Sequence, residues 1–412
     1  MKYVINNQVV LSRAPEGPLA SYIGSFAKSV SAQGYAPDSI YRRILLAACF
    51  SRWLRRNAVA RRRIASDHPA RYLRYRARQV RIARGDAAAL RHFIDFLRQE
   101  GVIPAEKISA SRLIPAEQCA QAYEQYLRED CAVSRATVVN YVPFARDFLK
   151  DRFGDGPATL SDLRACDVVR FVQRQARRLH VKRAQLMTAA LRSFLRYARY
   201  RGEVTLDLAA AVPAVANWTM TTIPRAIAPD QVRRLLADVD RHTAVGRRDY
   251  AILLLLARLG LRSSAVVLLE LDDIDWKAGC LRVGAKGDRR LELPLSQEVG
   301  QAIAAYLRGG RPHSTSRRVF LRAKAPICGF RGSSSVASLV RHSIMRAGVE
   351  APTYGAHQFR HGLATEMLRQ GASLGEIGDV LGHRHPDTTR IYTKVDLKAL
   401  HTLAQPWPGG VR

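Results

Sequence analysis

One pattern of apolar positions ending in glycine occurs twice in the first half of the chain. The stretch Ala89–Phe93 precedes Gly101, and the stretch Ala190–Phe194 precedes Gly202, with a constant offset of 101 residues. In both stretches apolar residues recur every three or four positions, as on the buried face of a helix, and glycine commonly follows a helix end. The first half is therefore predicted to contain two copies of one small helical module.

The predicted copies span residues 15–105 and 115–213, and both place basic residues between their apolar positions with few acids. In the first copy these include Arg61, Arg62, Arg63, Arg71, Arg74, Arg76, Arg78, Arg81 and Arg84. In the second copy they include Arg170, Arg174, Arg177, Arg178, Lys182 and Arg183. Across the chain, 66 Lys and Arg residues oppose 35 Asp and Glu, a formal net charge of +31. Such an excess needs a polyanion, and arginine-rich helix faces are typical of surfaces that follow nucleic-acid phosphates.

Nucleic acid is favoured over a membrane as that polyanion. The longest apolar runs, such as residues 251–257, are far shorter than the roughly 20 residues of a spanning helix. The start, Met1–Val4, does not open a signal peptide. The 6 cysteines stand singly, without CxxC pairs, as expected for small buried side chains in a reducing compartment. We therefore expect a cytoplasmic, nucleoid-associated protein with no membrane partner and no structural zinc.

The second half has a different pattern, which predicts an α+β domain. Residues 250–259 form a strongly apolar helical stretch that stops at Gly260. A short strand is predicted at 271–276, a hairpin at 281–293 and a further strand at 318–322, because apolar and polar residues alternate there. Helical patterns then continue to near the C-terminus.

These patterns predict a multidomain chain, mainly α in its duplicated N-terminal modules, followed by an α+β domain with a small antiparallel sheet. Residues 1–110 are assigned to an extra helical DNA-binding module, 111–215 to a second helical module and 216–412 to the α+β domain. The second module and the α+β domain are joined by a stretch without clear periodicity, bracketed by Pro213 and Pro224.

Two short motifs place histidine, arginine and tyrosine near the C-terminus. His357 and Arg360 stand three positions apart, so that both side chains lie on one face if the segment is helical. His383 follows Leu-Gly at a predicted helix end, and Tyr392 comes nine residues later on the next short helix, after Pro386 interrupts the chain. This order predicts that the four side chains converge.

Two further cations precede these motifs. Arg262 follows Gly-Leu where the apolar helix ends, and Lys286 lies in the predicted hairpin turn. Two guanidiniums can hold the non-bridging oxygens of a phosphodiester and stabilise the charge that develops during its displacement, which suits Arg262 and Arg360. Tyr392 is the candidate nucleophile. Because tyrosine has a pKa of about 10, it needs a proton acceptor and a cationic surround to attack at neutral pH.

The remaining residues are assigned to proton transfer and phosphate binding. His357 is the candidate proton acceptor or orienting group, Lys286 can protonate the leaving 5′ oxygen, and His383 can donate a hydrogen bond to the phosphate. No carboxylate cluster suggests a divalent metal, so neither a metal nor another cofactor is expected. His361 and His385 adjoin the motifs and are interpreted as packing or surface residues.

The stretches His357–Gly362, Leu381–His383 and Thr388–Tyr392, preceded by Arg262 and Lys286, resemble the tyrosine recombinase (phage integrase) family. The resemblance implies that the chain cuts DNA through a covalent 3′-phosphotyrosine and rejoins it without ATP in a four-subunit synapse. It thus implies double-stranded DNA and further copies of the chain as partners. It leaves open whether other recombinases of the same mobile element take part.

The resemblance is strong over residues 225–400, and the module at 115–213 is similar to the family's SAM-like core-binding domain. Two features depart from the family. Ala265 stands three residues after Arg262, where the family usually has an acid that would buttress the arginine. The module at 15–105 exceeds the usual two-domain plan, and it is interpreted as an arm-type DNA binder or a second clamp.

Integration or excision of a mobile element is therefore the predicted function, and two alternatives stay open. A type IB topoisomerase shares the chemistry but relaxes DNA without a partner site. Residues 397–403, predicted as a short helix that docks on a neighbouring subunit, favour the recombinase. A non-catalytic DNA-binding relative is suggested by Ala265 alone.

Overall fold

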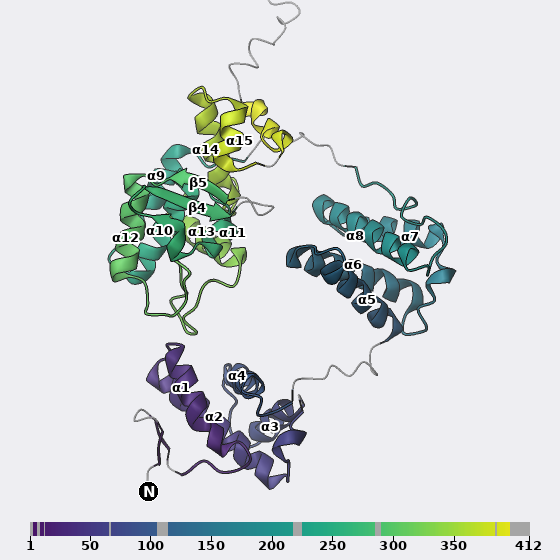
Figure 1. The fold of residues 1–412 in the computed structure, drawn as a ribbon, viewed down its shortest axis with the longest axis vertical. Helices are drawn as coiled ribbons and strands as arrows, with labels where there is room; N and C mark the ends of the chain where they lie inside the picture. The colour runs from purple at the N-terminus through teal and green to yellow at the C-terminus, as the bar shows by residue number, and fades with distance from the viewer. Residues whose placement is uncertain are drawn as a thin grey trace, which may run out of the picture. The chain divides into compact units, whose positions relative to one another are not determined.

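The computed structural model describes residues 3–5, 9–11, 13–65, 67–104, 114–216, 225–284, 290–383 and 385–395 (Figure 1). Lys286 and the helix predicted at 397–403 lie outside these residues. The buried hydrophobic side chains form three main cores, one each within 11–103, 116–212 and 227–359. Within the described ranges, no helix combines the length and the apolar character that crossing a bilayer requires.

The N-terminal core is built by four helices and a short hairpin. The hairpin pairs β1 (Tyr3–Ile5) with β2 (Val9–Leu11), and the helices are α1 (Ile23–Ala32), α2 (Pro37–Arg56), α3 (His68–Ala77) and α4 (Asp86–Gln99). Pro37 is the first residue of α2, a position whose amide needs no partner within the helix. Phe26, Phe50 and Phe93 are fully buried where these helices pack together.

The next segment has the same arrangement. Its helices are α5 (Pro115–Glu129), α6 (Arg135–Phe153), α7 (Ala165–Ala176) and α8 (Val181–Tyr200). In both segments the second helix packs against the first, third and fourth. A ring contact joins the second and third helices of each, with centroids 5.3 Å apart for Phe50 and Tyr72 and 5.2 Å apart for Phe148 and Phe171. The two segments thus share the order and the packing of their helices, and their origin by duplication stays a prediction from the constant offset.

The last segment surrounds one apolar helix. Its helices are α9 (Pro229–Ala237), α10 (Ala244–Arg258), α11 (Ser263–Leu268), α12 (Gln297–Gly309), α13 (Ser333–Ala347), α14 (His357–Arg369) and α15 (Leu374–Leu381). Two 3-10 turns follow, η6 (Pro386–Thr388) and η7 (Arg390–Val395). Residues 251–256 of α10 are fully buried. A helix that is apolar on all sides must be covered on all sides, and helices α9, α11, α12, α13 and α14 all contact α10.

A three-stranded antiparallel sheet completes this segment, which confirms the predicted α+β class. The strands are β3 (Ile274–Asp275), β4 (Cys280–Gly284) and β5 (Arg290–Pro294), in the order β3-β4-β5. Leu281 of β4 lies opposite both Ile274 and Leu293, and all three are buried. Apolar residues therefore share the face that packs on the helices.

Two strand predictions were wrong in extent. The strand expected at 271–276 is reduced to β3, because the Asp273 carboxylate accepts the amide of Glu270 at 2.8 Å and holds a 3-10 turn there. The segment 318–322 joins no sheet and forms only isolated bridges, such as that between Leu321 and Gly329.

A small fourth cluster lies at the C-terminal end of the described chain. It contains Ala364, Ile377, Leu381 and Tyr392, which come from α14, α15 and η7. Since short 3-10 turns have little stability of their own, these apolar contacts help to fix the position of η7.

A substitution at Gly260, just after α10, would show how tightly these helix ends pack. It has a φ of 57°, and a Cβ there would lie 2.9 Å from Leu381 Cδ2 and 3.0 Å from Leu363 Cδ2. Gly348, after α13, has a φ of 58° with nothing within 4 Å. We expect Gly348→Ala to lower the free energy of unfolding by about 1–2 kcal/mol through left-handed strain alone, and Gly260→Ala to lower it further. Denaturant unfolding of both variants measures the difference, and equal losses would contradict the packing.

Candidate active site

Arg262 lies where the chain leaves α10 and enters α11. It directly precedes α11, and its Nη2 donates to the carbonyl oxygen of Gly382 at 3.1 Å. Gly382 caps the C-terminal end of α15, where carbonyl oxygens lack partners within the helix and carry partial negative charge. Arg262 is thus supported by a backbone oxygen, although Ala265 provides no acid.

Arg360, on the first turn of α14, is held in the same way but is more deeply buried. Arg360 is only 7% exposed. Its Nη1 donates to the carbonyl oxygen of Gly260 at 2.8 Å, and its Nη2 donates to the carbonyl oxygen of Leu381. Burial and the neighbouring Arg262 lower the pKa of Arg360 to about 10, and Tyr392 opposes this shift. Arg360 therefore remains charged at neutral pH.

The two arginines line one recess. Ala265, Val283 and Leu381 also line it, so it lies between α11, β4 and α15. Its volume of about 20 Å³ suffices for roughly one water. The recess is therefore too small to enclose a phosphate group.

Tyr392 is 1% exposed and belongs to η7. Its hydroxyl lies 3.1 Å from Nδ1 of His361, and the two rings meet edge to face with centroids 5.8 Å apart. Burial raises the pKa of Tyr392, whereas the charge of Arg360 lowers it. The candidate nucleophile is thus protonated at neutral pH, and its hydroxyl is in contact with a histidine.

His361, which the sequence analysis interpreted as a packing or surface residue, lies in contact with the Tyr392 hydroxyl. Burial, then His357 and Arg360, lower the pKa of His361. The neutral imidazole can accept a hydrogen bond at Nδ1 when its proton is on Nε2. The available signal was position: His361 directly follows Arg360 and stands four residues, about one helical turn, after His357.

His383 follows the left-handed Gly382 at the end of α15, as expected for a helix-end histidine. Its Nδ1 lies 2.7 Å from Oγ1 of the buried Thr389. Burial, Arg360, Arg262 and His361 lower the pKa of His383 to about 4. His383 is therefore neutral at physiological pH and acts as a hydrogen-bonding group, not as a cation.

The structure thus places Arg262, Arg360, His383 and Tyr392 around the ends of α10 and α15. His357 begins α14 with an exposed side chain, close enough to influence the pKa of His361. The position of Lys286 is not described; the strands that flank its turn, β4 and β5, are present. Within the described ranges, no three His, Cys, Asp or Glu side chains gather as ligands for a metal ion.

Comparison with known proteins gives consistent matches. The phage integrase family matches residues 225–398, and the phage integrase N-terminal SAM-like domain matches residues 120–202. The y4rA protein of Sinorhizobium fredii, named as an integrase/recombinase, is 57% identical over 99% of each chain. Tyrosine recombinase XerC of a Mycobacterium species is 30% identical over 70% of this chain and 99% of its own.

Among solved structures, the fold is similar to that of the XerH site-specific recombinase bound to a palindromic difH substrate in a post-cleavage complex. The TM-score is 0.56 at 17% identity, and the match covers 71% of this chain and 97% of that one. At this identity the likeness concerns the fold alone.

Proposed function

Because the chain belongs to the phage integrase family of tyrosine recombinases, which cleave and rejoin DNA strands, we propose that it is a site-specific recombinase that integrates or excises a mobile element. The observation that carries this proposal is the environment of the Tyr392 side chain. Its hydroxyl lies 3.1 Å from Nδ1 of His361; burial raises the pKa of Tyr392, and the charge of the buried Arg360 opposes this shift. Similarity to y4rA over nearly the whole chain supports the same activity.

In the proposed cleavage, the Tyr392 hydroxyl oxygen attacks the scissile phosphorus. One phosphorus–oxygen bond forms to the tyrosine while the bond to the 5′ oxygen breaks, so the strand remains linked as a 3′-phosphotyrosine. The tyrosine proton passes to His361, in place of the His357 expected from the sequence, because Nδ1 of His361 lies 3.1 Å from the Tyr392 hydroxyl. His357 stands one helical turn away as an orienting group, and Lys286 protonates the leaving oxygen. Rejoining is the reverse step, so no nucleotide cofactor is consumed.

The phosphate is bound in this proposal by Arg262, Arg360 and His383. The helix-end carbonyls already orient both guanidiniums, so little reorganisation is needed when charge develops on the phosphate oxygens. His383 can donate from Nε2 while Nδ1 accepts from the Thr389 hydroxyl.

We further propose that four copies assemble on two sites of double-stranded DNA, in the cytoplasm and on the nucleoid. The net charge of +31 supports a polyanionic substrate. The proposed function is tested by expressing the protein in the presence of the DNA that flanks its own gene. Recombined junctions should be amplified with the wild type and not with Tyr392→Phe. Relaxation of supercoiled plasmids without new junctions would favour the type IB topoisomerase alternative.

His361→Phe keeps the ring contact with Tyr392 but removes the hydrogen-bond acceptor. We expect the rate of covalent cleavage to fall about 10²-fold, with unchanged DNA affinity. Since burial lowers the pKa of His361, the wild type should keep its rate as the pH falls through about 6.5 and lose it only below, where His361 becomes protonated. This acid-side loss should be absent in His361→Phe.

The matched control is His385→Phe, because His385 is an exposed histidine near the same motif. It should show the wild-type rate and pH profile in the same cleavage assay. A wild-type rate and profile for His361→Phe would mean that His361 only packs against the tyrosine.

A further inference from the structure

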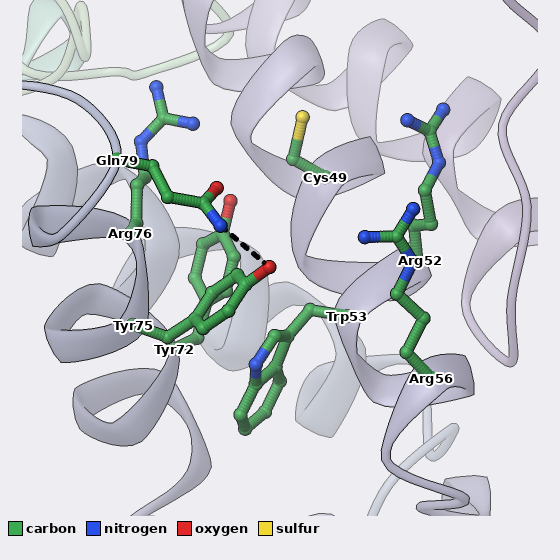
Figure 2. A pocket seen from close by; sticks show the side chains of 8 residues that line it. All are labelled: Cys49, Arg52, Trp53, Arg56, Tyr72, Tyr75, Arg76 and Gln79. Atoms are coloured by element: carbon green, nitrogen blue, oxygen red, sulfur yellow. Dashed lines mark hydrogen bonds between the residues drawn. The ribbon is translucent and has the colours of Figure 1, made fainter.

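A recess between α2 and α3 of the N-terminal module gathers cations and aromatic rings (Figure 2). We call it the α2–α3 recess. The residues that the argument uses are Arg52, Trp53 and Arg56 from α2 and Tyr72, Tyr75 and Arg76 from α3. Figure 2 shows Arg52 and Arg56 along one flank and Arg76 on the opposite flank, with the rings between them. The catalytic proposal uses none of these residues.

The two arginines of α2 are incompletely neutralised. Among the described residues, Arg56 is exposed and has no acidic partner. The nearest acid to Arg52 is Glu16, at 4.0 Å from Nε, and that carboxylate is closer to Arg55, at 2.5 Å. This flank of the recess therefore carries excess positive charge.

Arg76, on the opposite flank, has an unused donor. Its Nε is buried and makes no hydrogen bond, although it forms an ion pair with the Asp86 carboxylate at 3.8 Å. A buried donor without a partner costs free energy that an incoming acceptor can recover. The recess thus offers a donor as well as charge.

The aromatic rings of the recess pack against one another. Trp53 and Tyr72 are buried, with centroids 5.8 Å apart, and Gln79 Nε2 donates to the Tyr75 hydroxyl at 2.8 Å. Burial raises the pKa of Tyr72 to about 12, so its hydroxyl stays protonated. Since Trp53 and Tyr72 are buried against each other, their ring faces do not offer an open platform for stacking a base.

The volume of the recess further restricts the kind of ligand that it can hold. Its volume is about 140 Å³, whereas sites for small molecules and cofactors are usually about 300–1,000 Å³. A tetrahedral anionic group fits such a space.

The second module supplies an internal comparison. A recess lies at the equivalent place between α6 and α7, and two of its three arginines are paired with acids inside it. Arg152 lies 3.1 Å from Asp167, and Arg174 donates to Asp151. The described lining of the α2–α3 recess contains three arginines and aromatic rings but no carboxylate.

We propose that the α2–α3 recess binds a phosphate of the double-stranded DNA backbone. The proposal rests on the DNA-recombining function proposed above, and it gives the N-terminal module a specific part in substrate binding. Arg52 and Arg56 would hold the phosphate oxygens from one side and Arg76 from the other.

The test measures duplex binding of the full chain at several salt concentrations, in the Tyr392→Phe background so that no strand is cut. Each phosphate contact contributes about 0.9 to the slope of log affinity against log salt concentration. Arg56→Gln should therefore reduce this slope by about 0.9 on a duplex of any sequence. The matched control is Arg91→Gln, because Arg91 is an exposed arginine of α4 outside the recess; it should leave the slope unchanged.

An unchanged slope for Arg56→Gln, or an equal loss for Arg91→Gln, would overturn the proposal. A loss confined to single-stranded DNA would also overturn it, and would identify the recess as a stacking site. Covalent cleavage by the wild type is scored separately. A chain that cleaves but shows no slope change refutes the recess alone, whereas a slope change without cleavage refutes the recombinase alone.

A second measurement needs no substitution in the module. Cys49 lines the recess and is partly exposed. Duplex DNA should slow alkylation of the Cys49 thiol, as measured by mass spectrometry of the Cys49 peptide. Alkylation at the same rate with saturating duplex would contradict the proposal.

Discussion

Tyr392→Phe should reduce covalent attachment of DNA to background. Loss of a nucleophile removes the covalent route itself, so a fall of about 10⁴–10⁶-fold is expected. The phenylalanine ring can fill the same apolar cluster beside Ile377 and Leu381, so the fold should be retained. Only the hydrogen bond to His361 is lost, which costs about 0.5–1.5 kcal/mol. The assay incubates the protein with a nicked suicide duplex and resolves the covalent protein–DNA adduct on a denaturing gel.

Tyr354→Phe is the matched control, because Tyr354 is an exposed tyrosine close to α14 in sequence. It should form as much adduct as the wild type, and both variants should bind the uncut duplex with unchanged affinity. Persistence of the adduct in Tyr392→Phe would show that another residue attacks the phosphate.

Arg360→Lys should have the second largest effect, although it keeps the positive charge. A lysine amine lacks the planar fork that reaches the carbonyl oxygens of both Gly260 and Leu381. One buried carbonyl is then left unpaired, which should lower the free energy of unfolding by about 1–3 kcal/mol. Because the phosphate also loses an oriented donor pair, the cleavage rate should fall by about 10²–10³-fold.

Arg369→Lys provides the comparison for this prediction, since Arg369 is an exposed arginine in the last turn of the same helix. It should change neither denaturant unfolding nor single-turnover cleavage measurably. Cleavage by Arg360→Lys at the wild-type rate would contradict the role assigned to the Arg360 guanidinium.

Much of the fold could be predicted from local sequence patterns. The apolar run within α10 predicts a helix buried on all sides, the alternation within 281–293 predicts the β4–β5 hairpin, and the α14 helix begins at His357 as expected. These features depend on neighbouring residues, so their signals lie within a few turns or one hairpin. The strand expected at 318–322 depends instead on whether a distant strand is free to pair with it, which local alternation does not reveal.

The contacts that hold the candidate site residues in place were harder to predict from the sequence. The absence of an acid at Ala265 left Arg262 without an evident partner, but the structure supplies the Gly382 carbonyl oxygen. A backbone carbonyl belongs to every residue, so its use leaves no mark in the sequence. The contact of His361 with Tyr392 likewise depends on how η7 packs against α14, a long-range arrangement that residue spacing alone does not specify.

The central claim is that DNA becomes attached to the side chain of Tyr392. Its most direct test is mass spectrometry of the adduct that the wild-type chain forms with a nicked duplex, after digestion of both protein and DNA. The predicted result is a peptide that contains Tyr392 and carries a nucleotide through its 3′ phosphate. A nucleotide on any other residue, or one attached through its 5′ phosphate, would contradict the claim.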